Sequence, residues 1–282
     1  MLTILSTTAI GVVVKLAETR ISERLTMLFA NYVTASILST LLWLNSDIPF
    51  SLSSAALVMA PIGGFIFALN FFLMIVAIKK RGVALPVTLM RLSAVVPITA
   101  SIVLFRESPS SMQAAGAIGA LVAAAMLSIG VKGGEAASGV TRTSTIILIL
   151  SSIGLLLCFG LADLIMKLFE RLGIPDEKPL FLAMLFGLAA VMVLMVILMK
   201  KAKIIMRDFV WGIILGVPNL FASYFIVSAL RDLPAYIVFP SVAAGTVTLI
   251  TLIAMLGFRE RLNLWGIAGI ILTFASIAAL NR

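Results

Sequence analysis

The sequence predicts an all-α membrane protein with ten transmembrane helices, built as two five-helix repeats of opposite orientation. Hydrophobic residues make up 62% of the chain and charged residues 12%, whereas a soluble domain is about 45–50% apolar and about 25% charged. Apolar runs long enough to cross a bilayer recur along the whole chain. In addition, short motifs of the first half return in the same order in the second half.

The ten expected spans follow one another with only short polar breaks, which leave no room for a soluble domain. A helix needs about 20 apolar residues to cross a bilayer, and the first run is the shortest, reaching only about 24 Å at 1.5 Å per residue. A β-barrel is a poor alternative, because its strands would alternate apolar and polar residues over about ten positions, whereas these runs are apolar all round and longer. The expected spans are 2–17, 25–45, 55–78, 83–105, 111–131, 144–169, 180–199, 209–230, 234–257 and 263–280.

The composition excludes several classes of site. The chain has no histidine and a single cysteine, Cys158, so an internal disulfide, a histidine metal site and histidine general-base catalysis are excluded. We expect no metal, no cofactor and no catalytic residue. The net charge of +9 does not indicate nucleic acid, because the basic residues stand singly or in short clusters between apolar runs, as in membrane loops. No cleavable signal peptide is apparent, since Met1 leads directly into an apolar stretch.

The repeat has an offset of about 153 residues. Phe105-Arg106-Glu107 returns as Phe258-Arg259-Glu260, and Gly116 corresponds to Gly269. The alternative is chance similarity between apolar segments. We expect a first repeat at residues 1–134, a linker at 135–143 and a second repeat at 144–282. Because five is an odd number, the second repeat enters the membrane in the opposite orientation.

Inverted repeats predict a mechanism. Secondary transporters of this construction place their substrate near the bilayer midplane, between the repeats. When two equivalent, oppositely oriented halves exchange conformations, an outward-open cavity becomes inward-open. We therefore expect alternating access around a midplane cavity that holds a small-molecule substrate.

Two charged residues at membrane depth are the first candidates for substrate binding. Arg91 lies about 12 Å into the fourth span and Asp163 about 9 Å from the end of the sixth, by helix rise. Charges at such depth are costly and usually face a cavity or a partner. Arg91 would clamp a carboxylate or phosphate, and Asp163 would bind an ammonium group or carry a coupled proton. The alternatives are a lasting pair between the two, or a local pair of Asp163 with Lys167.

Further polar residues and prolines complete the candidates. Each polar side chain could bind substrate or could hydrogen-bond neighbouring helices. Proline frees a carbonyl within a helix, so paired prolines in the two halves indicate hinges near the binding region, with fixed kinks as the alternative. The polar candidates are Asn70, Asn219, Tyr224, Tyr236 and Ser241, and the hinge candidates are Pro61, Pro86, Pro97, Pro218 and Pro240.

The order of these motifs resembles the drug/metabolite transporter superfamily, and specifically its ten-helix EamA-type members. The fourth helix of each half ends in an apolar-x-Glu turn, at 104–107 and 257–260. A fifth helix rich in small residues follows, and the third helix carries an aromatic residue followed by an Ala-aliphatic-basic sequence, at 72–79 and 224–231. The resemblance implies export or exchange of amino acids, nucleotides, sugars or similar metabolites.

We therefore expect a secondary transporter, because no ATP-binding loop is present. We do not expect an enzyme, because with no histidine, one cysteine and scattered acids the sequence shows no catalytic constellation. The alternatives are a lipid-linked-sugar flippase of the same superfamily and an integral membrane enzyme acting on lipid phosphates. We expect a multi-pass protein of the plasma (inner) membrane, in contact with the lipid bilayer, with the fifth helices offering a seam for a homodimer. The distribution of Lys and Arg favours both termini outside, whereas the family habit is both termini in the cytoplasm.

Overall fold

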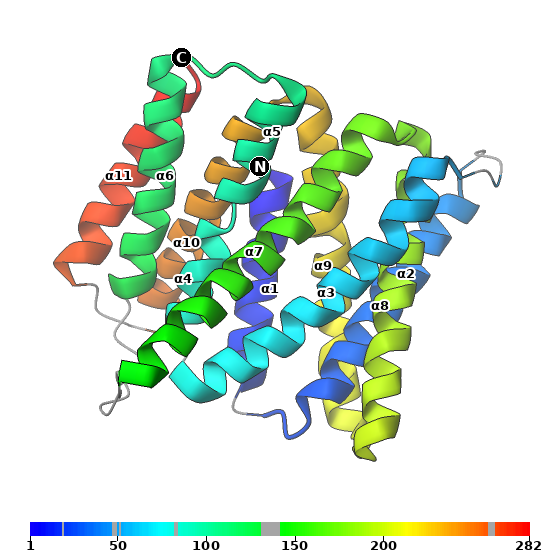
Figure 1. Ribbon diagram of the computed structural model, residues 1–282. Helices are drawn as coiled ribbons and strands as arrows, with labels where there is room; N and C mark the ends of the chain where they lie inside the picture. The colour runs from blue at the N-terminus through cyan, green and yellow to red at the C-terminus, as the bar shows by residue number, and fades with distance from the viewer. Residues whose placement is uncertain (19, 47–49, 51, 82–83, 131–141, 259–262) are drawn as a thin grey trace. The chain divides into compact units, whose positions relative to one another are not determined.

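The computed structural model describes residues 1–18, 20–46, 50, 52–81, 84–130, 142–258 and 263–282. These residues form α-helices and one short 3₁₀ turn, η1, and contain no strand (Figure 1). The all-α class is therefore confirmed for this part of the chain. The helices are α1 (Leu2–Glu18), α2 (Arg24–Leu44), α3 (Ser54–Arg81), α4 (Ala84–Leu92), α5 (Val95–Phe105), α6 (Ser111–Gly130), α7 (Arg142–Leu172), α8 (Lys178–Lys200), α9 (Met206–Asp232), α10 (Ala235–Phe258) and α11 (Leu264–Leu280), with η1 at Pro175–Glu177.

Seven helical segments of the described chain are long and apolar enough to cross a membrane. Three shorter apolar helices accompany them, at Leu2–Ala17, Ser111–Leu127 and Leu264–Leu280. Helix ends lie within a few residues of the expected spans, because continuous apolar runs specify these helices directly. The seven segments are Arg24–Leu44, Ser54–Met74, Thr88–Phe105, Ser152–Leu172, Pro175–Lys200, Met206–Asp232 and Ala235–Ile253.

The fourth span, expected as one helix over 83–105, consists of two helices, α4 and α5, which are separated at Ser93 and Ala94. The expected linker at 135–143 lies mostly outside the described residues, and α7 begins at Arg142.

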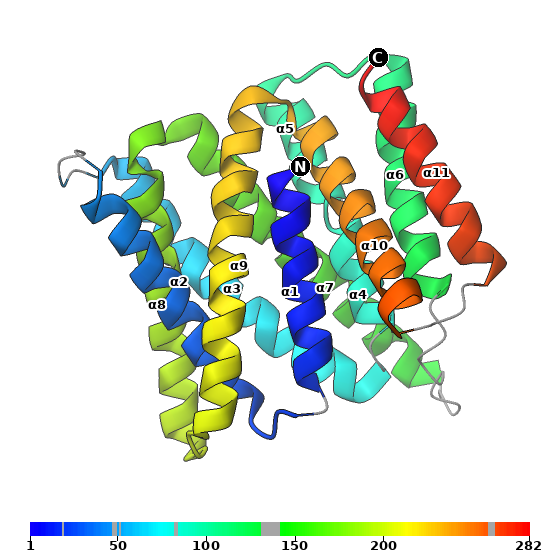
Figure 2. The ribbon, with the colours of Figure 1, turned by 180° about the vertical axis from the view of Figure 1, so that it is seen from behind.

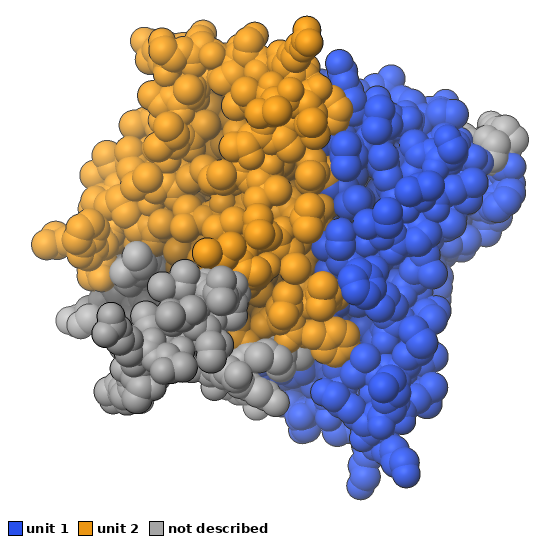
Figure 3. All heavy atoms as spheres, viewed as in Figure 1, with its two compact units in different colours: residues 1–68, 165–232 blue, residues 69–164, 233–282 orange. Residues whose placement is uncertain are grey.

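The chain divides into two compact units, coloured in Figure 3. Unit 1 contains residues 1–68 and 165–232, and unit 2 contains residues 69–164 and 233–282. Each unit takes helices from both predicted repeats. The boundaries of the predicted repeats therefore do not coincide with those of the two compact units. The repeats stay a prediction.

In unit 1, α2 packs against α8 and α9, and α9 also packs against α1 (Figure 2). The hydroxyl of Ser39 donates to the carbonyl of Pro179 at 2.7 Å, and that of Ser36 donates to the carbonyl of Ala183 at 2.9 Å. The later residue of α2 thus contacts the earlier residue of α8, and the earlier residue of α2 contacts the later one. These two helices are therefore antiparallel.

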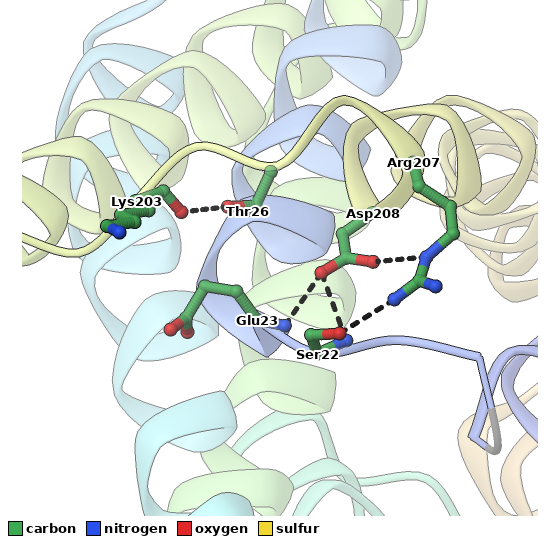
Figure 4. A network of polar contacts seen from close by, with 6 residues as sticks. All are labelled: Ser22, Glu23, Thr26, Lys203, Arg207 and Asp208. Atoms are coloured by element: carbon green, nitrogen blue, oxygen red, sulfur yellow. Dashed lines mark hydrogen bonds and ion pairs between the residues drawn. The ribbon is translucent and has the colours of Figure 1, made fainter.

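A buried carboxylate fixes the start of α2. Asp208, on the first turn of α9, accepts hydrogen bonds from the backbone N–H groups of Ser22 at 3.1 Å and Glu23 at 2.7 Å (Figure 4). The first N–H groups of a helix lack partners within the helix, and an anion near them also interacts favourably with the helix dipole. Arg207 completes the network by donating to Asp208 at 3.4 Å and to the Ser22 hydroxyl at 2.7 Å.

In unit 2, α6 and α11 approach closely through small residues. A Cβ atom on Gly116 would lie 2.9 Å from the carbonyl oxygen of Ser276 and 3.0 Å from the nitrogen of Leu280. A Cβ atom on Gly269 would lie 2.8 Å from Leu127 and 3.3 Å from the carbonyl oxygen of Ala123. These contacts show that α6 and α11 are antiparallel. The glycine-containing faces of the two helices pack against each other within one chain. The homodimer seam stays a prediction.

Candidate functional site

The interruption between α4 and α5 is caused locally by Pro97. Proline has no N–H to donate, and its ring clashes with the carbonyl four residues earlier, which here is that of Ser93. The N–H of Val96 donates to this carbonyl instead, at 2.9 Å, and the Ser93 hydroxyl donates to the carbonyl of Met90 at 2.6 Å. The α-helical hydrogen-bond pattern therefore stops at this point and starts again in α5.

Arg91 lies in the last turn of α4, directly before the interruption. Its Nε atom is buried and has no hydrogen-bond partner among the described residues. Its charge interacts with that of Asp163 on α7. Within the described chain, however, no carboxylate lies within the 4.0 Å of an ion pair with this guanidinium. The two opposite charges are near each other without direct contact.

Helix α7 packs directly on the interruption (Figure 1). A Cβ atom on Gly160 would collide with the side chain of Val96 and would lie 2.8 Å from the carbonyl oxygen of Ser93. Asp163 follows Gly160 by three residues and therefore shares its face of α7. Unit 2 thus gathers a helix break, a partly buried arginine whose Nε is enclosed, and a partly buried carboxylate. Such a set can bind a carboxylate through Arg91 and an ammonium group through Asp163.

The local alternative for Asp163 was a pair with Lys167. The Lys167 ammonium donates to Glu170 at 3.0 Å, in a nearly buried ion pair. Asp163 interacts electrostatically with Arg91, which lies far from it in sequence.

Three other candidates lie in unit 2. Asn70 on α3 is 5% exposed, and its Oδ1 has no partner among the described residues. Tyr236 is buried in the first turn of α10, and Ser241 is partly buried further along the same helix. Thr246 on α10 is not among the candidates named from the sequence, and its buried hydroxyl also lacks a partner in this part of the chain.

The remaining two polar candidates lie in unit 1. The side-chain amide of Asn219 on α9 donates to Asn31 on α2 at 3.2 Å, which supports its alternative role in joining helices. The Tyr224 ring lies beneath the ammonium of Lys178, with 3.7 Å between Nζ and the ring centroid. Lys178 also donates to the Ser228 hydroxyl at 2.6 Å. Sequence reasoning missed the involvement of Lys178, which it assigned to a loop.

The five hinge prolines occupy different settings. Helices α3, α9 and α10 continue through Pro61, Pro218 and Pro240. Pro86 and Pro97 are each the third residue of a helix, α4 and α5, where a missing N–H costs little. Of these five prolines, only Pro97 directly follows an interruption between two helices, α4 and α5. Pro97 therefore has the most direct structural effect. A hinge function stays a prediction for all five.

The described residues contain no group of three or more His, Cys, Asp or Glu side chains that could hold a metal ion. The carboxylate of Glu107, in the motif at the end of α5, accepts a hydrogen bond from the N–H of Ala235 at 2.9 Å. It thereby supports the first turn of α10. Its motif counterpart at 260 lies outside the described residues.

Comparisons with known proteins give a fold and no activity. No family model matches the chain. A protein of Haemophilus influenzae, described as uncharacterized, is 26% identical over 212 residues, which is 74% of this chain and 70% of that protein. One solved crystal structure has a TM-score of 0.78 at 15% identity and covers 99% of this chain and 98% of its own. The shared architecture therefore extends over the full length.

Proposed function

We propose that this chain is a secondary transporter that exports or exchanges small polar metabolites, such as amino acids or organic anions, across the plasma membrane. It uses no ATP. Its ten transmembrane helices form two inverted five-helix repeats of the drug/metabolite transporter type, and it works by alternating access. Proton coupling, with Asp163 as its site, is part of the proposal.

The helix break beside Arg91 and Asp163 carries this proposal. Transporters bind substrate near the midplane with discontinuous helices, whose free backbone groups and nearby charges meet the ligand. An arginine whose buried Nε has no partner among the described residues is costly at membrane depth, and such residues usually face a cavity or a partner. A ligand carboxylate at Arg91, together with an ammonium group at Asp163, would compensate both charges. A zwitterion such as an amino acid therefore fits best.

The inverted arrangement has support from pairs of corresponding helices. Helices α2 and α8 are each the second of their predicted repeat, and they are antiparallel. Helices α6 and α11 are each the fifth, and they are antiparallel as well. Their contacts are also reciprocal: Gly116 meets Ser276 and Leu280, while Gly269 meets Ala123 and Leu127, which are the same positions at the repeat offset.

Exchange in liposomes tests the function. The purified chain is reconstituted, the liposomes are loaded with an unlabelled amino acid or dicarboxylate, and entry of the labelled compound is followed. Replacing Arg91 by Gln should slow exchange of both classes by about tenfold or more, since a charge-assisted hydrogen bond is lost. Asp163→Asn should slow only the zwitterion. Arg106→Gln, at an exposed arginine just past α5, is the matched control.

The two variants give a clear decision. If both exchange amino acids and dicarboxylates at the wild-type rate, this site does not bind the substrate. If the wild-type protein exchanges neither class, the proposed substrate range is wrong. A loss in Arg106→Gln equal to that in Arg91→Gln would indicate a general effect of lost charge.

A further inference from the structure

Two cations meet in unit 1 where α8 begins and α9 ends. Lys178 is the first residue of α8, and Arg231 lies in the last turn of α9. The Lys178 ammonium donates to Ser228 on α9 at 2.6 Å, and Arg231 follows Ser228 by three residues on the same face of that helix, so the two positive charges are brought near each other. In the described part of the chain, no carboxylate lies within 4.0 Å of either cation. Their mutual repulsion is therefore not relieved by an ion pair.

The Lys178 ammonium is held in place by uncharged groups. It donates to the Ser228 hydroxyl at 2.6 Å and stands 3.7 Å from the centroid of the Tyr224 ring. The Ser228 hydroxyl in turn donates to the carbonyl of Tyr224 at 2.9 Å. An ammonium group has three donors, and these contacts leave donors unused. The side chain is thus ordered and partly buried while it retains its capacity to bind an anion.

The three acids close in sequence form no ion pair with these two cations. Both carboxylate oxygens of Glu177 accept from the N–H of Ser53, at 2.9 Å each. Asp176 and Asp232 are exposed and form no ion pair with either cation. The start of α8 carries the positive end of its helix dipole, and the end of α9 carries the negative end of its own, so the dipoles do not decide the charge at this place.

We propose that Lys178 and Arg231 form a binding site for one oxyanion, a carboxylate or a phosphate group. A guanidinium binds such planar groups through two parallel hydrogen bonds, and an ammonium adds a point charge. The anion belongs either to a free metabolite or to the headgroup of an anionic lipid, since both present the same oxygen atoms. These two cations belong to unit 1, whereas Arg91 belongs to unit 2, and occupancy of the proposed site does not require transport.

Thermal unfolding of the detergent-purified chain tests this site in two arms. In the first arm, inorganic phosphate is titrated against chloride at constant ionic strength. In the second, phosphatidylglycerol is compared with phosphatidylcholine in mixed micelles. A ligand that binds only the folded protein raises the unfolding temperature. We expect a rise with phosphate, with phosphatidylglycerol or with both, and the responding arm identifies the source of the anion.

Variants assign the rise to the two cations. Arg231→Gln should weaken the apparent affinity by about tenfold or more, because a charge-assisted contact is lost. Lys178→Gln should do the same, and Lys200→Gln, at the exposed end of the same helix, should leave it unchanged. If Lys178→Gln does not fold, Arg231→Gln decides alone, since Arg231 is exposed. No rise in either arm, or an equal rise in Arg231→Gln, would overturn the proposal.

Discussion

Replacement of Gly160 by Ala tests whether α7 fixes the break between α4 and α5. The new Cβ would lie 2.8 Å from the carbonyl oxygen of Ser93 and would overlap Val96. Carbon–oxygen contacts are ordinarily about 3.3–3.6 Å, so the backbone at the break must move by roughly half an ångström or more. Neither neighbouring atom is the flexible end of a side chain. The overpacking should therefore cost about 1–3 kcal/mol.

Gly154 is the matched control on the same helix, because a Cβ there would have no neighbour within 4 Å. Both substitutions gain about 0.5–1 kcal/mol from the better helix propensity of alanine. The difference between the two variants therefore isolates the clash. We expect Gly154→Ala to be as stable as the wild type or slightly more stable, and Gly160→Ala to be less stable than Gly154→Ala by about 1–3 kcal/mol.

The assay is chemical or thermal unfolding in detergent, followed by tryptophan fluorescence, together with exchange in liposomes. Displacement of the break also displaces Arg91, so Gly160→Ala should lose exchange activity beyond what its stability explains. Equal stability of Gly160→Ala and Gly154→Ala would refute the packing argument. A destabilised Gly160→Ala variant with normal exchange would separate the break from transport.

Two further predictions concern buried polar groups, at Asp208 and at Thr246. Asp208→Ala should destabilise the folded state by about 2–4 kcal/mol, since the N–H groups of Ser22 and Glu23 lose their acceptor. Asp208→Asn should cost less, because its amide oxygen can still accept these hydrogen bonds. Equal losses of stability in the two variants, measured by unfolding in detergent, would contradict this reasoning. Thr246→Val should leave stability unchanged or raise it by up to about 1 kcal/mol, because it removes a buried hydroxyl without a partner; a clear loss of stability would indicate a partner that the folded chain supplies.

Most helices of the described chain could be predicted from the sequence, because their signal is local. A continuous apolar run specifies a buried or lipid-facing helix wherever it occurs. The break before Pro97 could not be predicted with the same certainty. Pro61, Pro218 and Pro240 lie inside helices that continue. Whether a proline bends or interrupts a helix depends on its surroundings, and here these include Gly160 of a distant segment, which lies against the Ser93 carbonyl.

The candidate site likewise contains residues that could be predicted from the sequence, whereas the involvement of Lys178 could not be. Arg91 and Asp163 could be found because a charge inside an apolar run is conspicuous in one sequence. Lys178 stands at the end of a polar break and gives no such signal. Its role depends on Tyr224 and Ser228, which lie about 50 residues later in the chain and are brought to it by the packing of α8 on α9. Only its position next to Pro179 indicated that a helix begins there.

The symmetry of the proposed repeats and the asymmetry of the site have different consequences. At the repeat offset, Arg91 corresponds to Ala244, which is fully buried in the continuous helix α10. One repeat thus supplies a break and a cation where the other supplies an unbroken helix and a small residue. Equivalent packing, as at Gly116 and Gly269, would allow the two repeats to exchange conformations at little cost in free energy. A single cationic site near the midplane would then give both conformations the same ligand preference, so the substrate gradient alone would set the direction of transport unless protons are coupled to it.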